Sequence, residues 1–258
     1  MVPVVLLTDF GLHDSYVGQM KGAMLGVNPR LQIVDLMHEL PAYGIEVAAY
    51  ILAYTYTVFP KGSVFVCVVD PGVGTRRAAI AVKADGYYFV GPDNGIFSVI
   101  VLKTNDHKIR EIKNGSFWRK KVSSTFHGRD IFGPTGAHIA TSPKSFDRVG
   151  PLCRKMVELP HKLPEVKDDL IDGRIIHIDR FGNMLTNIES RYIPQDAVIH
   201  VGDRRIDHIA STYGEIGTGK TAGIRDSLGL LEIAIRERSC AEVMDAEIGQ
   251  KIRVVRKK

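Results

Sequence analysis

An acidic residue directly follows a strongly apolar stretch in the N-terminal half of the chain. The segment SVFVCVV (63–69) predicts a buried strand, and Asp70 begins the run Asp-Pro-Gly-Val-Gly-Thr-Arg-Arg. Open α/β sheets bind ligands outside the carboxyl ends of their strands, so a carboxylate here could take part in chemistry. An ordinary turn would explain Asp70 as well, but Arg76 and Arg77 favour a site. The glycines do not complete GxGxxG, so a dinucleotide site is not supported.

A second polar segment carries a histidine among hydroxyl-bearing residues. Residues 123–130 read Ser-Ser-Thr-Phe-His-Gly-Arg-Asp. A histidine close to an aspartate and an arginine can orient a water molecule or accept its proton. A single histidine is more often structural, and Asp130 could simply cap the helix predicted to follow it. Both interpretations of His127 stay open on these residues alone.

A third polar cluster, Asp-Arg-Phe-Gly-Asn at 179–183, follows a predicted strand in the second half of the chain. An aspartate and an asparagine on either side of an aromatic residue can bind a zwitterion or stack on a base. Turn chemistry alone would also select Asp, Gly and Asn. The cluster is therefore either a ligand site or a structural turn.

One further motif is a look-alike of the phosphate-binding P-loop. Residues 214–221, Gly-Glu-Ile-Gly-Thr-Gly-Lys-Thr, match GxxxxGK[ST]. A P-loop must follow a buried strand and open a helix, because the helix N-terminus completes the phosphate cradle. Here the preceding HIASTY is a poor central strand, and the following AGIRDSLGLLEIAI contains glycines and alternates like a strand. The context therefore argues against phosphate binding at this motif.

Alternating strands and helices must position the N-terminal motifs. Short apolar runs predict strands at 3–8, 31–36 and 63–69. Between them, apolar spacing predicts one helix after a cap at Asp14 and a second over 45–59. Asp85-Gly86 then marks a hairpin turn. This order predicts a mainly parallel α/β domain over 1–156.

The pattern changes after residue 156. Residues 157–170 contain prolines and mixed charges, which predicts a linker. Beyond it, residues 171–258 hold short runs with a period near two, at 174–179, 197–202 and 230–235, broken by Gly, Pro and Asp. Such runs predict a smaller antiparallel β-domain.

The composition is ordinary for a soluble globular protein, with 45% hydrophobic and 24% charged residues. No apolar run approaches the ~18 residues of a membrane span. The three cysteines are far apart and odd in number, which fits a reducing cytoplasm rather than disulfides or a CxxC metal site. The net charge of +5 lies in the last eight residues, KIRVVRKK, which carry five basic groups and no acid. A basic tail on a neutral body is weak support for nucleic-acid binding, so we expect neither nucleic-acid nor membrane partners.

Six motifs occur in one order along the chain: LLTDFG, VVDPGVGT, GPDNG, TFHGRDIF, FGN and DSLGLLEIA. In this combination the chain resembles the S-adenosylmethionine hydrolase (hydroxide adenosyltransferase) family, relatives of the enzymes that make fluoro- and chloro-deoxyadenosine. The resemblance covers nearly the whole chain. It implies an N-terminal α/β domain and a C-terminal β-barrel-like domain. It also implies a homotrimer, in which each ligand lies between the first domain of one subunit and the second domain of its neighbour.

The resemblance also assigns roles to individual residues. Asp70, Arg77 and His127 correspond to the family's Asp-Arg-His set, and the family spacing after GVGT selects Arg77 over Arg76. Asp9 matches the aspartate that binds the ribose hydroxyls. The other positions that correspond to substrate-binding residues are Asn94, Thr125, Phe126, Asp179, Phe181, Asn183, Tyr213, Ser227 and Glu232.

Two places depart from the pattern of relatives. His127 and Gly128 stand where fluoride-handling enzymes carry an aromatic residue and a serine, and His127 together with the arginine favours water as nucleophile. Arg236-Glu237-Arg238 stands where many relatives have smaller or amide residues, so the adenine contacts there are expected to differ.

The resemblance implies an enzyme that hydrolyses S-adenosyl-L-methionine to adenosine and L-methionine, by attack of an activated water on the ribose C5′. It implies no metal and no cofactor, since S-adenosylmethionine is the substrate. Two alternatives remain: a chloride-dependent halogenase, and a module that binds S-adenosylmethionine or adenosine without cleaving it.

Overall fold

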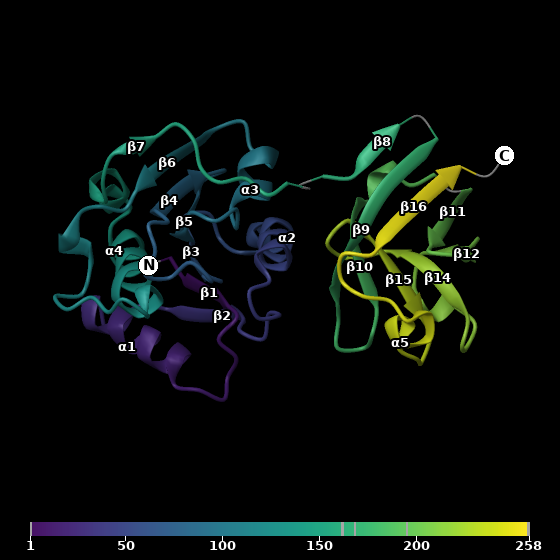
Figure 1. Cartoon of the computed structure of the whole chain (residues 1–258), viewed down its shortest axis with the longest axis horizontal. Helices are drawn as coiled ribbons and strands as arrows, with labels where there is room; N and C mark the ends of the chain where they lie inside the picture. The colour runs from purple at the N-terminus through teal and green to yellow at the C-terminus, as the bar shows by residue number, and fades with distance from the viewer. Residues whose placement is uncertain (1, 161–162, 168, 195, 257–258) are drawn as a thin grey trace. The chain divides into compact units, whose positions relative to one another are not determined.

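The structure is a computed structural model that describes residues 2–160, 163–167, 169–194 and 196–256. The chain divides into two compact units, Met1–Pro160 and His161–Lys258 (Figure 1). The linker predicted over 157–170 includes residues 161, 162 and 168, which lie outside the described residues, and a short strand, β8, falls within it. The fold class predicted from the sequence, an α/β unit followed by a β unit, is confirmed.

The N-terminal unit is built on a seven-stranded sheet with the order β2-β1-β3-β5-β4-β6-β7. Its strands β2, β1, β3 and β5 run parallel, whereas β4, β6 and β7 pair antiparallel. The change of direction occurs at the predicted hairpin, where Asp85 and Gly86 both have positive φ, as a tight hairpin turn requires. The bounds are β1 Val4–Thr8, β2 Ile33–Met37, β3 Val64–Val68, β4 Ala79–Ala84, β5 Tyr87–Pro92, β6 His107–Glu111 and β7 Leu152–Cys153.

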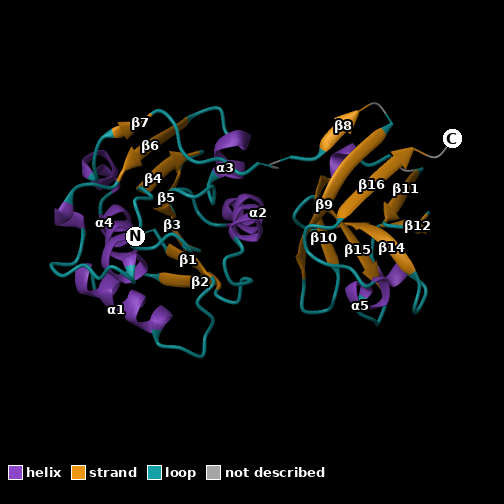
Figure 2. Ribbon diagram, in the orientation of Figure 1, coloured by secondary structure: helices purple, strands orange, loops and turns teal. Residues whose placement is uncertain are grey.

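Helices cover both faces of this sheet (Figure 2). Because side chains alternate along a strand, Val4, Leu6 and Val66 join the core under α1 and α4, and their neighbours in the chain point to the opposite face. The helix predicted from an Asp14 cap begins one residue later, with Ser15 as N-cap and no side-chain capping bond. Within the described residues, no helix is both long and apolar enough to cross a membrane. The helices are α1 Tyr16–Val27, α2 Ile45–Thr55, α3 Ser98–Lys103 and α4 Gly133–Thr141.

The C-terminal unit is one curled sheet with the strand order β12-β11-β16-β9-β10-β15-β14-β13, and β8 added on β9. All its pairs are antiparallel except β13 with β14. The curl brings β14 over β11, since a Cβ added at Gly223 would lie 2.4 Å from the Cδ1 of Ile199. The bounds are β8 Glu165–Lys167, β9 Leu170–Ile178, β10 Met184–Glu189, β11 Ala197–Val201, β12 Arg204–Ile206, β13 Ile209–Ala210, β14 Thr221–Arg225, β15 Leu230–Ile235, α5 Cys240–Met244 and β16 Lys251–Arg256.

The P-loop look-alike leads into a strand. Thr221 begins β14, and β14 pairs along its length with β15. No helix N-terminus follows Lys220, so the backbone geometry that holds a phosphate is absent from this part of the described chain. The prediction that this motif is not a P-loop is confirmed.

Candidate active site

An aspartate and an arginine form a closed pair at the carboxyl end of β3. The Arg77 Nε donates to the Asp70 Oδ1 at 2.9 Å, and the Arg77 Nη2 donates to the other carboxylate oxygen. The side chains are 5% exposed for Asp70 and 11% for Arg77. Two parallel N–H···O bonds fix the carboxylate in direction as well as in charge. The neighbouring Arg76 is exposed, so the structure pairs Asp70 with Arg77 and not with Arg76.

The same guanidinium also holds the histidine. The Arg77 Nη2 lies 2.8 Å from the His127 Nδ1. Arginine can only donate, so Nδ1 must accept, and a neutral His127 carries its proton on Nε2. Burial and then the Arg77 charge lower the pKa of His127 below its usual value, against smaller opposing effects of Asp70 and Asp130. The ring is therefore held neutral, with Nε2–H as a donor.

Asp130 fixes the segment that carries His127. Residues Gly128–Phe132 form a turn of π-helix that continues into α4, and such turns are frequent at functional sites. The fully buried Asp130 carboxylate accepts from Arg129 Nε at 2.7 Å, from Arg119 Nη1 at 3.0 Å and from Ser123 N at 2.8 Å. Burial raises its pKa, but these bonds outweigh burial and leave the pKa below the usual value. Asp130 therefore does not act as the helix cap that its position would allow, and it holds the 119–130 loop closed instead.

A small pocket of about 210 Å³ opens beside this group. It brings together five of the residues predicted from the sequence, and adds four other members of the same motifs and one residue outside them, Tyr43. Among the added residues, Tyr43 has a left-handed φ of 65° and donates its backbone N–H to the Asp9 Oδ2 at 2.9 Å. The lining residues are Asp9, Phe10, Tyr43, Val68, Asp70, Val73, Thr125, Phe126, His127 and Gly128.

Asn94 lies next to the pocket and does not line it. Its Nδ2 donates to the Val69 carbonyl at 2.7 Å, and its Oδ1 accepts from the Ile96 N–H. These bonds hold the chain directly before Asp70. The structure therefore gives Asn94 a positioning contact, whereas the resemblance implies that it binds substrate.

In the C-terminal unit, Asp179 accepts the hydrogen bonds of a tight turn and also lines two pockets. Its Oδ1 accepts from the backbone N–H groups of Phe181 and Asn183 at 2.8 Å, and its Oδ2 accepts from the Asn183 side chain at 3.0 Å. Asp179, Asn183 and Tyr213 line two pockets of about 640 and 620 Å³. Phe181, with 75% of its surface exposed, lines the smaller one. The structure therefore confirms the turn, and the ligand site stays a prediction for residues that line two pockets.

The larger of these two pockets is acidic. The Tyr213 hydroxyl donates to the Glu232 Oε1 at 2.6 Å. Burial, with repulsion from Asp179 and Asp226, raises the pKa of Glu232, and burial raises that of Asp226. Burial and the Glu232 carboxylate raise the pKa of Tyr213. Three carboxylates and one arginine, Arg225, line the pocket, and the excess of carboxylates suits a cationic ligand. Ser227, predicted as a substrate contact, lines this pocket beside them.

His177, which the sequence motifs did not indicate, also lines the acidic pocket. His177 pairs with Leu185 across β9 and β10, and Leu185 pairs with Glu232 across β10 and β15, so the three side chains share one face. The His177 Nδ1 is buried without a hydrogen-bond partner in the described residues. His177 stands two residues before Asp179 in a predicted strand, and this spacing indicates that the two side chains lie on the same face.

The chain matches one family over most of its length. Residues 4–150 match the N-terminal domain of SAM hydroxide adenosyltransferase, and residues 173–253 match its C-terminal domain. An (R)-S-adenosyl-L-methionine hydrolase of Thermus thermophilus is 34% identical over 99% of this chain and 100% of its own length. A protein of the same name from Methanocaldococcus jannaschii is 41% identical over 72% of this chain and 66% of its own. Three fluorinases are more distant, at 22%, 24% and 26% identity.

The fold has a close counterpart among solved structures. A crystal structure of an uncharacterized conserved protein from Thermotoga maritima superimposes with a TM-score of 0.92. It is 34% identical in sequence and covers 98% of this chain and 100% of its own. The two domain matches and this structural similarity show that the chain belongs to the SAM hydroxide adenosyltransferase family.

Proposed function

We propose that this protein is an enzyme that hydrolyses S-adenosyl-L-methionine to adenosine and L-methionine. The observation that carries the proposal is the Arg77 guanidinium, which joins the Asp70 carboxylate to the Nδ1 of a neutral His127. Asp70 and His127 line a pocket, and Arg77 is not among its lining residues. Relatives at 31–41% identity named (R)-S-adenosyl-L-methionine hydrolase support the assignment.

In this reaction the nucleophile needs more activation than the leaving group. S-adenosylmethionine is a sulfonium, so methionine leaves from the ribose C5′ as a neutral thioether. Water is a weak attacker, with a pKa near ~15.7. In the proposed step a water oxygen forms a bond to C5′ as the C5′–S bond breaks, and one proton leaves the water. Positioning that water in line contributes roughly 7–11 kcal/mol. The proposal includes no cofactor.

We assign the activation of the water to three side chains. Asp70 accepts the proton of the water, because the Nε2 of the neutral His127 already carries one. The His127 Nε2–H then donates to the water and fixes the direction of its remaining lone pair. Arg77 holds both groups from the side of the nucleophile, so its positive charge favours hydroxide character while staying away from the sulfonium.

This division predicts an acid limit set by His127. A protonated His127 can no longer accept from Arg77, so activity falls as the pH drops through the folded pKa of the ring, which lies below the usual 6.5. We expect kcat to be constant around pH 7 and to decline below pH 6.5. In His127→Asn the amide oxygen can replace Nδ1 as acceptor without titrating, so this limb should be absent although kcat is reduced. An identical acid limb in both proteins would contradict the assignment.

A product analysis tests the proposed reaction against its alternatives. The protein is incubated with S-adenosylmethionine, with and without chloride, and the products are identified by mass spectrometry. Adenosine and methionine in equal amounts under both conditions support hydrolysis. Chloro-deoxyadenosine would identify a halogenase, unchanged substrate would identify a binding module, and free adenine would place the attack at the glycosidic carbon.

The proposed site needs residues from both units. The substrate-holding candidates Asp9, Thr125 and Phe126 belong to the N-terminal unit. The acidic pocket, with Asp179 and Ser227, belongs to the C-terminal unit and suits the ammonium of the methionine part. As the resemblance implies a homotrimer, we propose that each substrate lies between the N-terminal unit of one copy and the C-terminal unit of a neighbouring copy.

A mixed-subunit experiment tests this arrangement. Asp70→Asn and Asp179→Asn are each expected to be nearly inactive, and Asn at 179 can still accept the turn bonds through its Oδ1. When the two variants are co-expressed, roughly one quarter of sites combine two intact halves in a closed ring of subunits. We therefore expect activity to return to about a quarter of the wild-type value. Activity no higher than that of the separate variants would place the whole site within one chain.

We also place the reaction in a reducing compartment, the cytoplasm. The three cysteines, Cys67, Cys153 and Cys240, are free, and two of them are buried in the cores of the units. Such usage is typical of proteins that fold without disulfides.

A further inference from the structure

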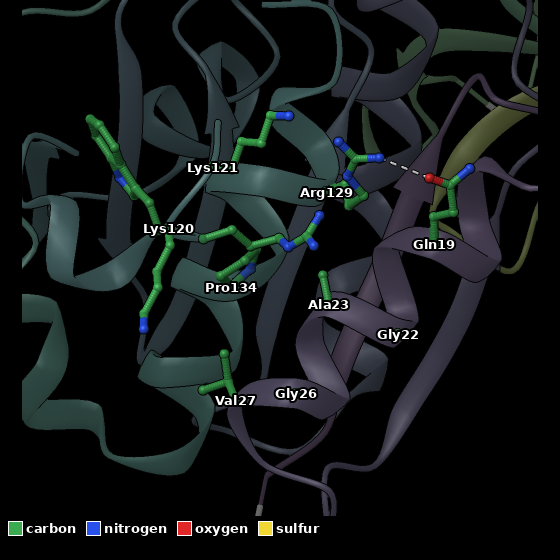
Figure 3. Close-up of a pocket in the computed structure, with 11 residues that line it drawn as sticks. Gln19, Gly22, Ala23, Gly26, Val27, Lys120, Lys121, Arg129 and Pro134 are labelled. Atoms are coloured by element: carbon green, nitrogen blue, oxygen red, sulfur yellow. Dashed lines mark hydrogen bonds between the residues drawn. The ribbon is translucent and has the colours of Figure 1, made fainter. Parts of the chain in front are cut away.

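A second cavity lies on the side of α1, apart from the residues assigned to the reaction. It has a volume of about 770 Å³ and lies between the helix and the segment 118–121 (Figure 3). In Figure 3 the residues Gly22, Ala23 and Gly26 of α1 lie on one side of it and Pro134, Lys120 and Lys121 on the other, with the two lysine side chains pointing away from each other. A Cβ added at Gly22 or Gly26 would meet no heavy atom within 4 Å, so the helix side of the cavity is bare backbone. The space is open to a ligand rather than filled by side chains.

The charged side chains that line this cavity are all basic. Four basic side chains line it, Arg119, Lys120, Lys121 and Arg129, and no acidic residue of the described chain does so. Arg119 and Arg129 share the carboxylate of Asp130, which leaves a net charge of +3. Lys120 and Lys121 are exposed, and neither has a carboxylate within ion-pair distance among the described residues. This positive charge is not neutralised within the unit.

The positions of the two arginines are set independently of any ligand. Asp130 is fully buried, and it holds Arg129 through two bonds and Arg119 through one. The Arg129 Nη1 also donates to the Gln19 side chain on α1 at 2.9 Å, as the dashed line in Figure 3 shows. Ordering long side chains before a ligand arrives lowers the entropy cost of binding. The arginines thus form a prepared, rigid part of the site, and the lysines form a mobile part.

The remaining lining is apolar with one polar atom. Trp118, Val27 and Pro134 contribute apolar surface. The indole Nε1 of Trp118 is buried and has no hydrogen-bond partner in the described residues. A ligand that matches the basic side chains and this apolar surface carries several negative charges at one end and an uncharged or aromatic part at the other. Guanidinium groups bind phosphate oxygens in pairs, and lysines bind them as point charges.

We infer that this cavity is a binding site for a polyphosphate group, carried by a nucleotide or by inorganic polyphosphate. The phosphates contact Lys120, Lys121 and the free N–H groups of Arg119 and Arg129, and Trp118 lies at the edge of the bound group. This binding is separate from the proposed hydrolysis, because Trp118, Lys120 and Lys121 have no role in that reaction, and Arg119 and Arg129 act in it only by holding Asp130.

The test uses the protein's own tryptophan. Trp118 is the sole tryptophan of the chain, so its fluorescence reports this cavity directly. The full chain is titrated with inorganic tripolyphosphate and, separately, with ATP, by fluorescence and by isothermal titration calorimetry. We expect saturable binding of tripolyphosphate that weakens with added salt. Tighter binding of ATP would identify a nucleotide as the carrier, and equal binding would identify the polyphosphate chain itself as the recognised group.

Two matched double variants test whether tripolyphosphate binds in this cavity. The double variant Lys120→Gln/Lys121→Gln removes two exposed charges and should weaken binding about tenfold or more. The control Lys108→Gln/Lys144→Gln removes the same charge from exposed positions that do not line the cavity, and should bind like the wild type. No saturable signal by either method, or equal affinity in the two double variants, would overturn the inference.

Discussion

Replacing Asp70 by asparagine is expected to lower kcat by about 10²–10⁴-fold, the usual contribution of a general base. The substitution keeps the size of the side chain and removes the proton acceptor. KM for S-adenosylmethionine should change little, because Asp70 faces the water in the proposed geometry and other residues hold the substrate. Steady-state kinetics with adenosine detection measures both constants.

A second aspartate provides the control for this change. Asp85 lies in the hairpin between β4 and β5 and pairs with Lys61. Its φ of 48° is one that asparagine also adopts readily, so Asp85→Asn removes a charge from the same unit without strain. We expect this variant to keep the wild-type kcat. An Asp70→Asn enzyme as active as the Asp85→Asn enzyme would exclude Asp70 as the base.

Replacing Arg77 should affect both activity and stability, and two substitutions separate these effects. Arg77→Met leaves the Asp70 carboxylate, only 5% exposed, without its counter-charge. Removing one partner of a buried ion pair is expected to lower the free energy of unfolding by about 3–5 kcal/mol. Arg77→Lys keeps the charge but loses the planar fork that reaches Asp70 and His127 together. We expect this variant to remain largely stable and to lose about 10²–10³-fold in kcat, the loss seen when a preorganised donor is removed.

Arg76 is the matched control for these variants. It is the adjacent residue in the chain, and it is exposed. Arg76→Met should leave the free energy of unfolding within about 0.5 kcal/mol of the wild type and kcat unchanged. Denaturant unfolding and steady-state kinetics measure the three variants side by side. A larger loss of kcat in Arg76→Met than in Arg77→Lys would reverse the assignment of the arginine.

The sequence was most informative where one local rule decided the structure. The apolar run at 63–69 predicted a buried strand, and a strand end is where an α/β sheet exposes functional groups. The structure places Asp70 at the end of β3, paired with Arg77. The glycines after Thr221 excluded a helix, which removed the P-loop. In the C-terminal unit, the period of two predicted β9, β11 and β15 at close to their observed positions.

Residues whose role depends on long-range contacts were harder to predict. Asp130 has the residue type and place of a helix cap, but Arg119 and Arg129 draw its carboxylate into a buried cluster. Asn94 stands in a motif, yet it bonds to the Val69 carbonyl 25 residues away in the chain. His177 reaches the acidic pocket only because β9, β10 and β15 lie in register. The partners of these residues follow from tertiary packing, and a local pattern such as the spacing of His177 and Asp179 indicates only a shared face.

The central claim is that water itself attacks C5′, with Asp70 as base and not as nucleophile. A single turnover in ¹⁸O-labelled water, with enzyme in excess over S-adenosylmethionine, tests it directly. Direct attack predicts that the adenosine of this first turnover carries the label at its 5′-oxygen. If Asp70 instead attacked C5′ to form an ester, the first adenosine would take its oxygen from the carboxylate. Unlabelled adenosine, with ¹⁸O recovered in Asp70 by peptide mass spectrometry, would contradict the account.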